Sequence, residues 1–226
     1  MDSGKCWPRR LLRSTTRSGF LWLLAVSATA SAQPATEGNA GSAAILETFL
    51  GDVHALTADF KQELWSADQR LLQTDTGTLS LQRPNRFRWI YAHPKQLTVV
   101  ADGKRLWIYD VELAQVTVSP LDSTVESTPA MLLSGDRNVR DGFNVVQSEK
   151  LDGLDWVKLV PKQGGADFTS VRIGFKGKAP QRLELVDGLN QVTRIELTNL
   201  VVNPDLSDGT FEFEPPPGID VIGDKG

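Results

Sequence analysis

Beyond residue 57, most of the chain alternates apolar and polar positions with a period of two, which is the spacing of a half-buried β-strand. Turn residues such as Asp102-Gly103 separate these segments, because aspartate and glycine both tolerate positive φ. The predicted strands cover residues 57–65, 77–82, 86–91, 97–101, 106–110, 115–119, 143–147, 156–160, 170–175, 182–185 and 192–200. Short strands at this spacing, with no internal repeat and no dividing linker, predict one curved antiparallel sheet or barrel.

Residues 43–56, before the first strand, have the apolar spacing of an amphipathic helix instead. Ser42 is a plausible N-cap, since its hydroxyl can accept a bond from a free main-chain N–H. The apolar positions at helical spacing are Ile45, Leu46, Phe49, Val53 and Leu56. We expect one amphipathic helix here.

Residues 128–135 predict a second, much shorter helix. Thr128 can cap it, Pro129 suits the first helical position, and a glycine follows the end. A helix of less than two turns does not persist on propensity, so apolar side chains must dock it onto the sheet. These side chains are Met131, Leu132 and Leu133. The two helices could cover one opening of the sheet, or the second could be a connector at its edge.

The strand at residues 86–91 carries a row of aromatic side chains. Its period places Phe87, Trp89 and Tyr91 on one face. Four of the six tryptophans fall in predicted strands, namely Trp65, Trp89, Trp107 and Trp156. Such aromatic surface is either ordinary core or the wall of an apolar ligand pocket. Composition alone favours ordinary core.

Residues 1–32 have the pattern of a secretory signal peptide. Basic residues come first, residues 20–28 are apolar, and Ala30-Ser31-Ala32 supplies a cleavage site before Gln33. The apolar stretch is shorter than the roughly 20 residues that a membrane-spanning helix needs. A retained amphipathic anchor is the alternative interpretation. We expect an exported protein with residues 33–226 as a single domain.

Loss of this signal peptide would leave 19 basic and 27 acidic residues, a net charge near −8. That balance argues against nucleic acid as a partner and against charge-driven binding to an anionic membrane. The only cysteine, Cys6, lies in the signal peptide, so the predicted mature chain has no disulfide and no lipidated cysteine.

Catalytic and metal-binding motifs are absent from the sequence. His54 and His93 stand alone, without the ligand spacing of a metal site. Neither a glycine-rich phosphate loop nor a nucleophile elbow occurs. Glu212 and Glu214 share one face of a predicted late strand, where alternating acids usually face solvent. We therefore expect no enzyme activity and no cofactor.

Four motifs in a fixed order carry a family resemblance. They are Arg83-Pro84-Asn85-x-Phe87-x-Trp89, Asp102-Gly103-Lys104-x-Leu106-Trp107-x-Tyr109, Thr128-Pro129-x-Met131-Leu132, and Phe211-x-Phe213-x-Pro215-Pro216 with Gly218. Over roughly residues 46–221, the combination resembles the LolA family, the periplasmic carriers of outer-membrane lipoproteins. The resemblance implies a mainly β (α+β) fold, an unclosed antiparallel β-barrel of about 10 to 11 strands with a short helical lid over a hydrophobic cavity.

The resemblance also implies a function. It is that of a monomeric periplasmic chaperone that binds the acyl chains of lipoproteins released from the inner membrane. Cargo would come from an ATP-driven inner-membrane transporter and pass to an outer-membrane receptor. That receptor has a similar barrel but is itself lipidated, whereas this chain has no cysteine for a lipid after residue 32. A periplasmic lipid-binding sensor domain of the same barrel type is the alternative, and an esterase is the third.

Arg83 is the candidate for a lid latch. The last carbonyls of a helix lack intrahelical partners, and a guanidinium offers five donors in a fixed fork. In the family, the matching arginine is thought to hold the lid closed, although this arginine could instead satisfy only its own turn. The predicted acyl-chain contacts are Phe87, Trp89, Trp107, Met131, Leu132 and Leu133. Ala130 and Arg86 depart from the family, which often has a larger apolar residue in the lid and an apolar residue beside Phe87.

Overall fold

The computed structural model describes residues 37–121, 129–135, 142–162 and 167–223. These described residues form one compact unit. The predicted signal peptide, residues 1–32, and the predicted cap Thr128 lie outside the described residues. None of the described helices is long and apolar enough to cross a membrane.

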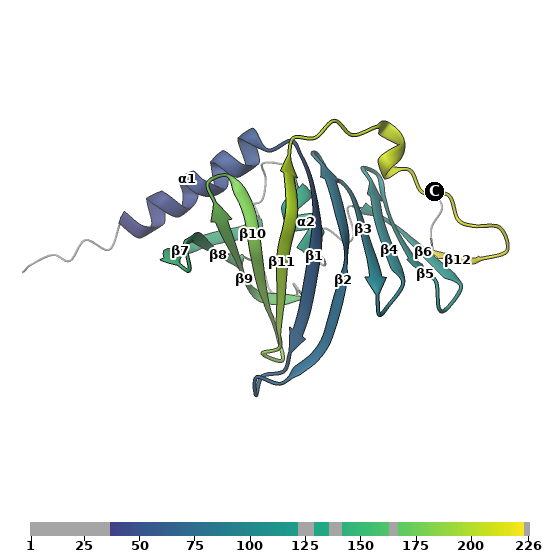
Figure 1. Cartoon of the computed structure of the whole chain (residues 1–226), viewed down its shortest axis with the longest axis horizontal. Helices are drawn as coiled ribbons and strands as arrows, with labels where there is room; N and C mark the ends of the chain where they lie inside the picture. Colours follow the sequence, from purple (N-terminus) through teal and green to yellow (C-terminus); the bar gives the residue numbers. More distant parts are fainter. Residues whose placement is uncertain (1–36, 122–128, 136–141, 163–166, 224–226) are drawn as a thin grey trace, which may run out of the picture. The chain divides into compact units, whose positions relative to one another are not determined.

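Twelve strands make one sheet in the order β12-β6-β5-β4-β3-β2-β1-β11-β10-β9-β8-β7. They are β1 (Ala55–Trp65), β2 (Leu71–Gln82), β3 (Arg86–His93), β4 (Leu97–Asp102), β5 (Arg105–Asp110), β6 (Gln115–Pro120), β7 (Phe143–Leu151), β8 (Leu154–Pro161), β9 (Phe168–Lys176), β10 (Ala179–Asp187), β11 (Val192–Val202) and β12 (Asp220–Gly223). Neighbours are antiparallel except β12 and β6, which are parallel. Because β7 and β12 stand at opposite ends of this order, the sheet is unclosed, as predicted (Figure 1).

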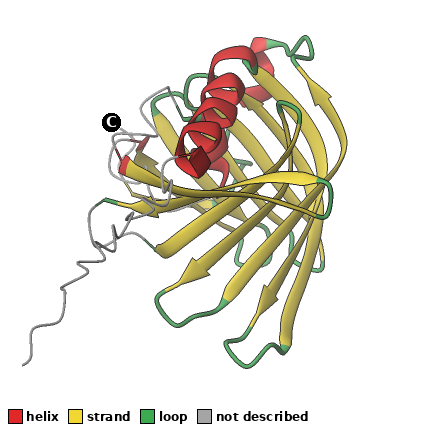
Figure 2. Cartoon of the chain, turned by 90° about the vertical axis from the view of Figure 1, so that its left-hand side faces the viewer, coloured by secondary structure: helices red, strands yellow, loops and turns green. Residues whose placement is uncertain are grey.

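Two α-helices of the described part of the chain pack on the sheet. The first, α1 (Glu37–Asp52), contacts β7 and β8 and lies across the curved sheet (Figure 2). The second, α2 (Pro129–Ser134), contacts β2 and β3 and matches the predicted short helix. The predicted bounds of the first helix, residues 43–56, were wrong at both ends. Val53 and Leu56 lie beyond the end of α1 and are still buried. The apolar pattern therefore does not mark where α1 stops.

Alternation along the strands creates two apolar clusters on opposite faces of the sheet. We call the larger one the interior cluster, and both helices and nearly all strands contribute to it. The smaller outer cluster consists of Val100, Trp107, Val116 and Val118, packed against the chain after β11. Strands β4 and β5 are therefore buried on both faces, which makes their apolar positions almost continuous in sequence.

The carboxyl-terminal part departs from the sequence prediction. Residues 203–223, the C-terminal segment, contain a 3-10 helix, η2 (Asp208–Phe211), and the short strand β12. Glu212 and Glu214 lie between these elements and not in a strand, so the predicted late strand was wrong. Three consecutive prolines follow Glu214, and a proline has no N–H to donate to a β ladder. The strand count of twelve thus exceeds the predicted 10 to 11.

Candidate functional site

The ends of α1 and α2 meet at Arg83, in the turn between β2 and β3. Arg83 Nε donates a hydrogen bond of 2.8 Å to the carbonyl of Val53, the residue after α1. Its Nη1 donates one of 2.6 Å to the carbonyl of Gly135, the residue after α2. One guanidinium therefore joins the carboxyl ends of both helices.

Main-chain groups of the same turn bind the same two helix ends. The Arg83 N–H donates to the His54 carbonyl at 2.8 Å, and the Asn85 N–H donates to the Ser134 carbonyl at 3.0 Å. The guanidinium carbon also lies 4.5 Å from the centroid of the Phe49 ring on α1. A cation at this point complements the partial negative charge of both helix C-termini. The turn at residues 83–85 thus fixes α1 and α2 electrostatically and through four hydrogen bonds.

A second polar side chain holds α1 alone. Asn203, just after β11, accepts bonds from the main-chain N–H groups of His54 and Ala55 at 2.8 and 3.2 Å. Its Nδ2 donates to the Asp52 carbonyl at 2.8 Å. The role of Asn203 is not evident from the sequence, because an asparagine at a strand end is equally typical of an ordinary turn.

The interior cluster lies directly beneath this junction. Five of the six predicted acyl-chain contacts belong to it, namely Phe87, Trp89, Met131, Leu132 and Leu133, and each is at most 6% exposed. The α2 side chains thus cover the aromatic strand β3 in this closed form. Any ligand that reaches Phe87 and Trp89 from this side must displace α2.

Trp107, the sixth predicted contact, lies on the other face of the sheet, so its assignment to the cavity is corrected. Its ring packs 5.7 Å from that of Phe213, and its Nε1 donates to Asp102 Oδ2 at 3.0 Å. Burial opposes ionisation of Asp102, but this bond and two main-chain N–H bonds lower the pKa of its carboxyl. Alternation places Leu106 and Trp107 on opposite faces without saying which face is the interior.

Other interior aromatics were not assigned to the site by the sequence. Phe60 packs 4.9 Å from Trp89 and 5.1 Å from Tyr91, measured between ring centroids. Phe175 packs 5.4 Å from Phe49 of α1. Period two places each on a face, but only the curvature of the sheet brings β9 and β1 over the same interior.

This arrangement agrees with the comparisons with known proteins. The family model described as outer membrane lipoprotein carrier protein LolA matches residues 51–214. The chain belongs to the LolA family. The predicted resemblance is therefore confirmed.

Relatives of the LolA family match most of the chain. An outer-membrane lipoprotein carrier protein of Dechloromonas aromatica is 37% identical over 88% of this chain and 96% of its own length. An outer-membrane lipoprotein carrier protein of Methylococcus capsulatus is 41% identical over 80% of this chain and 86% of its own length. A solved structure of an uncharacterised conserved protein from Thermus thermophilus shares the fold, with a TM-score of 0.50 at 14% identity, over 81% of this chain and 97% of that one.

The two departures from the LolA pattern have structural explanations. Ala130 is 2% exposed and packs in the interior cluster, so α2 has little room at this position for a larger side chain. Arg86 lies 3.7 Å from Asp208 of η2, on the outer face. Its charge therefore meets the chain's own C-terminal segment.

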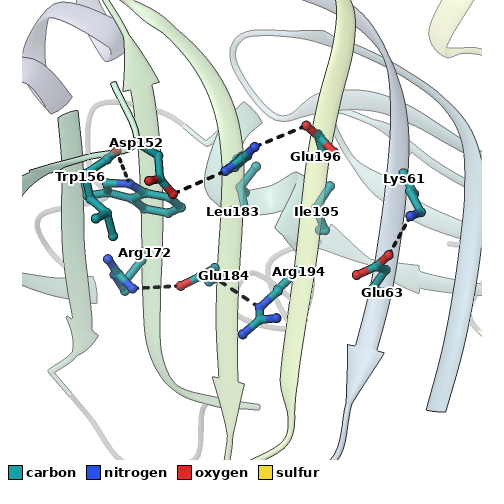
Figure 3. A pocket seen from close by; sticks show the side chains of 12 residues that line it. Lys61, Glu63, Asp152, Trp156, Arg172, Leu183, Glu184, Arg194, Ile195 and Glu196 are labelled. Atoms are coloured by element: carbon teal, nitrogen blue, oxygen red, sulfur yellow. Dashed lines mark hydrogen bonds and ion pairs between the residues drawn. The ribbon is translucent and has the colours of Figure 1, made fainter. Parts of the chain in front are cut away.

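A shallow pocket of about 280 Å³ on the outer face of this LolA family member is the alternative site (Figure 3). Its charged side chains pair with one another: Arg172 binds Glu184 at 2.9 Å, and Arg182 lies 3.6 Å from Glu196. Arg172 also lies 4.6 Å over the ring of Trp156. Its lining has equal numbers of acidic and basic residues, and each cation already has a carboxylate. This pattern is typical of a stabilising surface ladder and does not favour a charged ligand.

Proposed function

We propose that the chain is a periplasmic carrier that buries the acyl chains of outer-membrane lipoproteins against the interior cluster, beneath α1 and α2. One observation carries the proposal: a single guanidinium joins the ends of two helices that cover an apolar aromatic strand. Membership of the LolA family supports the same function. The protein acts as a carrier and not as an enzyme, and it needs no cofactor.

Energetics explain why such a carrier needs a closed empty form. Burial of one CH₂ contributes roughly 0.8 kcal/mol, so an anchor of dozens of CH₂ groups represents on the order of tens of kcal/mol. A site that matched this free energy without opposition would not release its cargo. In the closed form, Met131, Leu132 and Leu133 occupy the interior face themselves. Loading exchanges their contacts for acyl contacts, which lowers the net affinity.

The hydrogen bonds of Arg83 also oppose the loading of cargo. Displacement of α2 breaks the bond to Gly135 and the neighbouring bond from Asn85 to Ser134. A charge-assisted hydrogen bond is worth roughly 1.5 to 3 kcal/mol, which corresponds to about tenfold or more in affinity. Arg83 thus acts as a latch that favours release.

The proposed route follows the family. The mature protein, residues 33–226 after cleavage before Gln33, is a single-domain monomer in the periplasm. It receives cargo from an ATP-driven inner-membrane transporter and delivers it to an outer-membrane lipoprotein receptor. It does not bind nucleic acid.

Site-specific photo-crosslinking tests the proposal. A photoreactive residue replaces Trp89 in one variant and Trp107 in another, so that one probe lies in the interior cluster and the other in the outer cluster. In a periplasm that contains lipoproteins, we expect capture from position 89 and none from position 107. Capture from neither position, with no lipoprotein in an extract of the purified protein, would contradict the carrier function.

A further inference from the structure

The interior face of β1 to β3 changes from apolar to polar with distance from the lid. Four successive rungs of paired residues show the change. From the lid outward they are Leu81 with Phe87, Leu79 with Trp89, Gly77 with Phe60 and Tyr91, and Asp75 with Gln62. The two rungs nearest the lid each pair a leucine with an aromatic ring, the third holds two aromatic rings, and the fourth holds only polar side chains. This sequence of surfaces matches a lipid that lies with its tails toward the lid.

Asp75 is the unusual member of the polar end. It is 3% exposed, and it is one of two buried polar residues in the described part of the chain. Both hydrogen bonds that the described residues give its carboxylate come from Gln73 Nε2, at 3.0 and 2.8 Å. No described lysine or arginine lies within ion-pair distance of it. An ionised carboxylate has room for about four donors, and its burial is costly without them.

Tyr91 and Gln62 complete the polar group. Tyr91 Oη donates a hydrogen bond to Gln62 Oε1 at 3.3 Å. Burial and the Asp75 charge raise the pKa of Tyr91, so its hydroxyl remains a donor at all physiological pH values. The group thus combines one buried carboxyl group with two amides and a hydroxyl.

A purely structural role explains this group poorly. Structural carboxylates in a sheet normally gain a cation or several main-chain N–H donors, as Asp102 does on the outer face. Asp75 faces an apolar interior and binds only a neutral neighbour on its own strand. A buried charge of this kind lowers the stability of the empty protein, which is typical of groups kept for a ligand.

We propose that Gln62, Gln73, Asp75 and Tyr91 form a subsite for the polar junction of the lipid-modified cysteine. This inference rests on the proposed carrier function. The Asp75 carboxylate accepts hydrogen bonds from the amide N–H groups of the acylated cysteine and the residue after it. The side-chain amides and the Tyr91 hydroxyl donate hydrogen bonds to the ester carbonyls of the glyceryl group. The acyl chains then extend along the aromatic rungs toward α2.

The test compares two ligands in the full mature protein. One is a synthetic tripalmitoylated cysteinyl peptide, which has the acyl tails and the cysteine junction. The other is the fluorescent fatty acid cis-parinaric acid, which has a tail and a carboxylate but no cysteine junction. We expect Asp75→Asn to weaken lipopeptide binding by about tenfold or more and to leave fatty-acid binding unchanged. The control Asp59→Asn makes the same change on the outer face of the neighbouring strand β1, where Asp59 accepts a bond from Asn199. It should change neither affinity.

Stability separates a subsite from a structural role. The unfolding midpoint of Asp75→Asn should equal or exceed that of the wild type, because the variant no longer buries a charge. Tyr91→Phe, which keeps the ring, should weaken the lipopeptide alone by a few-fold. Unchanged lipopeptide affinity in both variants, or equal losses for the two ligands, would overturn the subsite. A wild-type protein that binds neither ligand would overturn the carrier function itself.

Discussion

Two regions of this molecule are attached to the sheet by the same chemistry. Arg83 donates to two main-chain carbonyls at the ends of α1 and α2. Arg88 donates to the carbonyls of Thr210 and Glu212 in the C-terminal segment, at 2.7 and 2.6 Å. The first arginine serves the interior side of the sheet, and the second serves the outer face.

The remaining attachments of the two regions differ. The C-terminal segment adds main-chain pairing of β12 with β6 and the packing of Phe213 against Trp107. The six-residue helix α2 adds mainly apolar contacts in the interior cluster. Acyl chains can replace apolar contacts, whereas they offer no hydrogen bonds to replace those of a strand. We therefore expect the same arginine chemistry to be reversible at α2 and permanent at the C-terminal segment.

The largest expected effect is that of Arg83→Leu on cargo release. Loss of the bonds to Val53 and Gly135 destabilises the closed empty form, so bound cargo is held more tightly. We expect normal loading and a release to the receptor that is about tenfold to a hundredfold slower. Transfer of a labelled lipoprotein to the purified receptor measures it. Release at the wild-type rate would refute the latch.

The matched variant Arg88→Leu should affect stability instead. It leaves the Thr210 and Glu212 carbonyls without their donor, at a cost of about 2 to 4 kcal/mol in the free energy of unfolding. Denaturant unfolding measures this loss, and the transfer assay should give the wild-type rate. Slow release in Arg88→Leu would mean that the two regions are not independent.

A smaller effect is expected for Asn203→Ala. The variant loses the side-chain bonds that hold the end of α1 to the sheet, which should lower the free energy of unfolding by about 1 kcal/mol. Because Asn203 contacts the end of α1 and not α2, cargo affinity should stay close to that of the wild type. A large gain in affinity would show that α1, and not α2, is the helix that cargo displaces.

The smallest effect concerns pH and the outer cluster. The folded-state pKa of Asp102 is lowered, so its stabilising contribution is complete above the ordinary aspartate pKa and is lost as pH falls through the lower folded value. We expect Asp102→Asn to flatten the acid limb of the stability curve without changing cargo release. An unchanged acid limb would show that the bond to Trp107 does not depend on charge.

Parts of the fold could be predicted because period two is a local property. It placed Phe87 and Trp89 on one face of β3, and both are in the interior cluster. It failed for Trp107 because β5 is buried on both faces, and the covering segment comes from the far end of the chain. Strand β12 was not predicted either. It has only four residues, and its parallel pairing with β6 leaves no local pattern in the sequence.

The site itself depended on contacts that no local pattern contains. The sequence offered an arginine before a turn, and only the family resemblance suggested a latch. Its partners, Val53 and Gly135, come from segments on either side of it in the chain. Asp75 gave no signal either, because a carboxylate in a polar strand is normally exposed and this one is buried.

The amide of Asn85 offers the most direct test of whether cargo displaces α2. Its N–H donates to the Ser134 carbonyl at the end of α2, so it reports the attachment of the lid without any mutation. Hydrogen exchange measured by NMR, with and without the tripalmitoylated peptide, gives the protection of the Asn85 amide. The amides of β12 serve as the reference. The account predicts that ligand accelerates exchange at Asn85 and leaves β12 unchanged. Full protection of Asn85 in the loaded protein would contradict it.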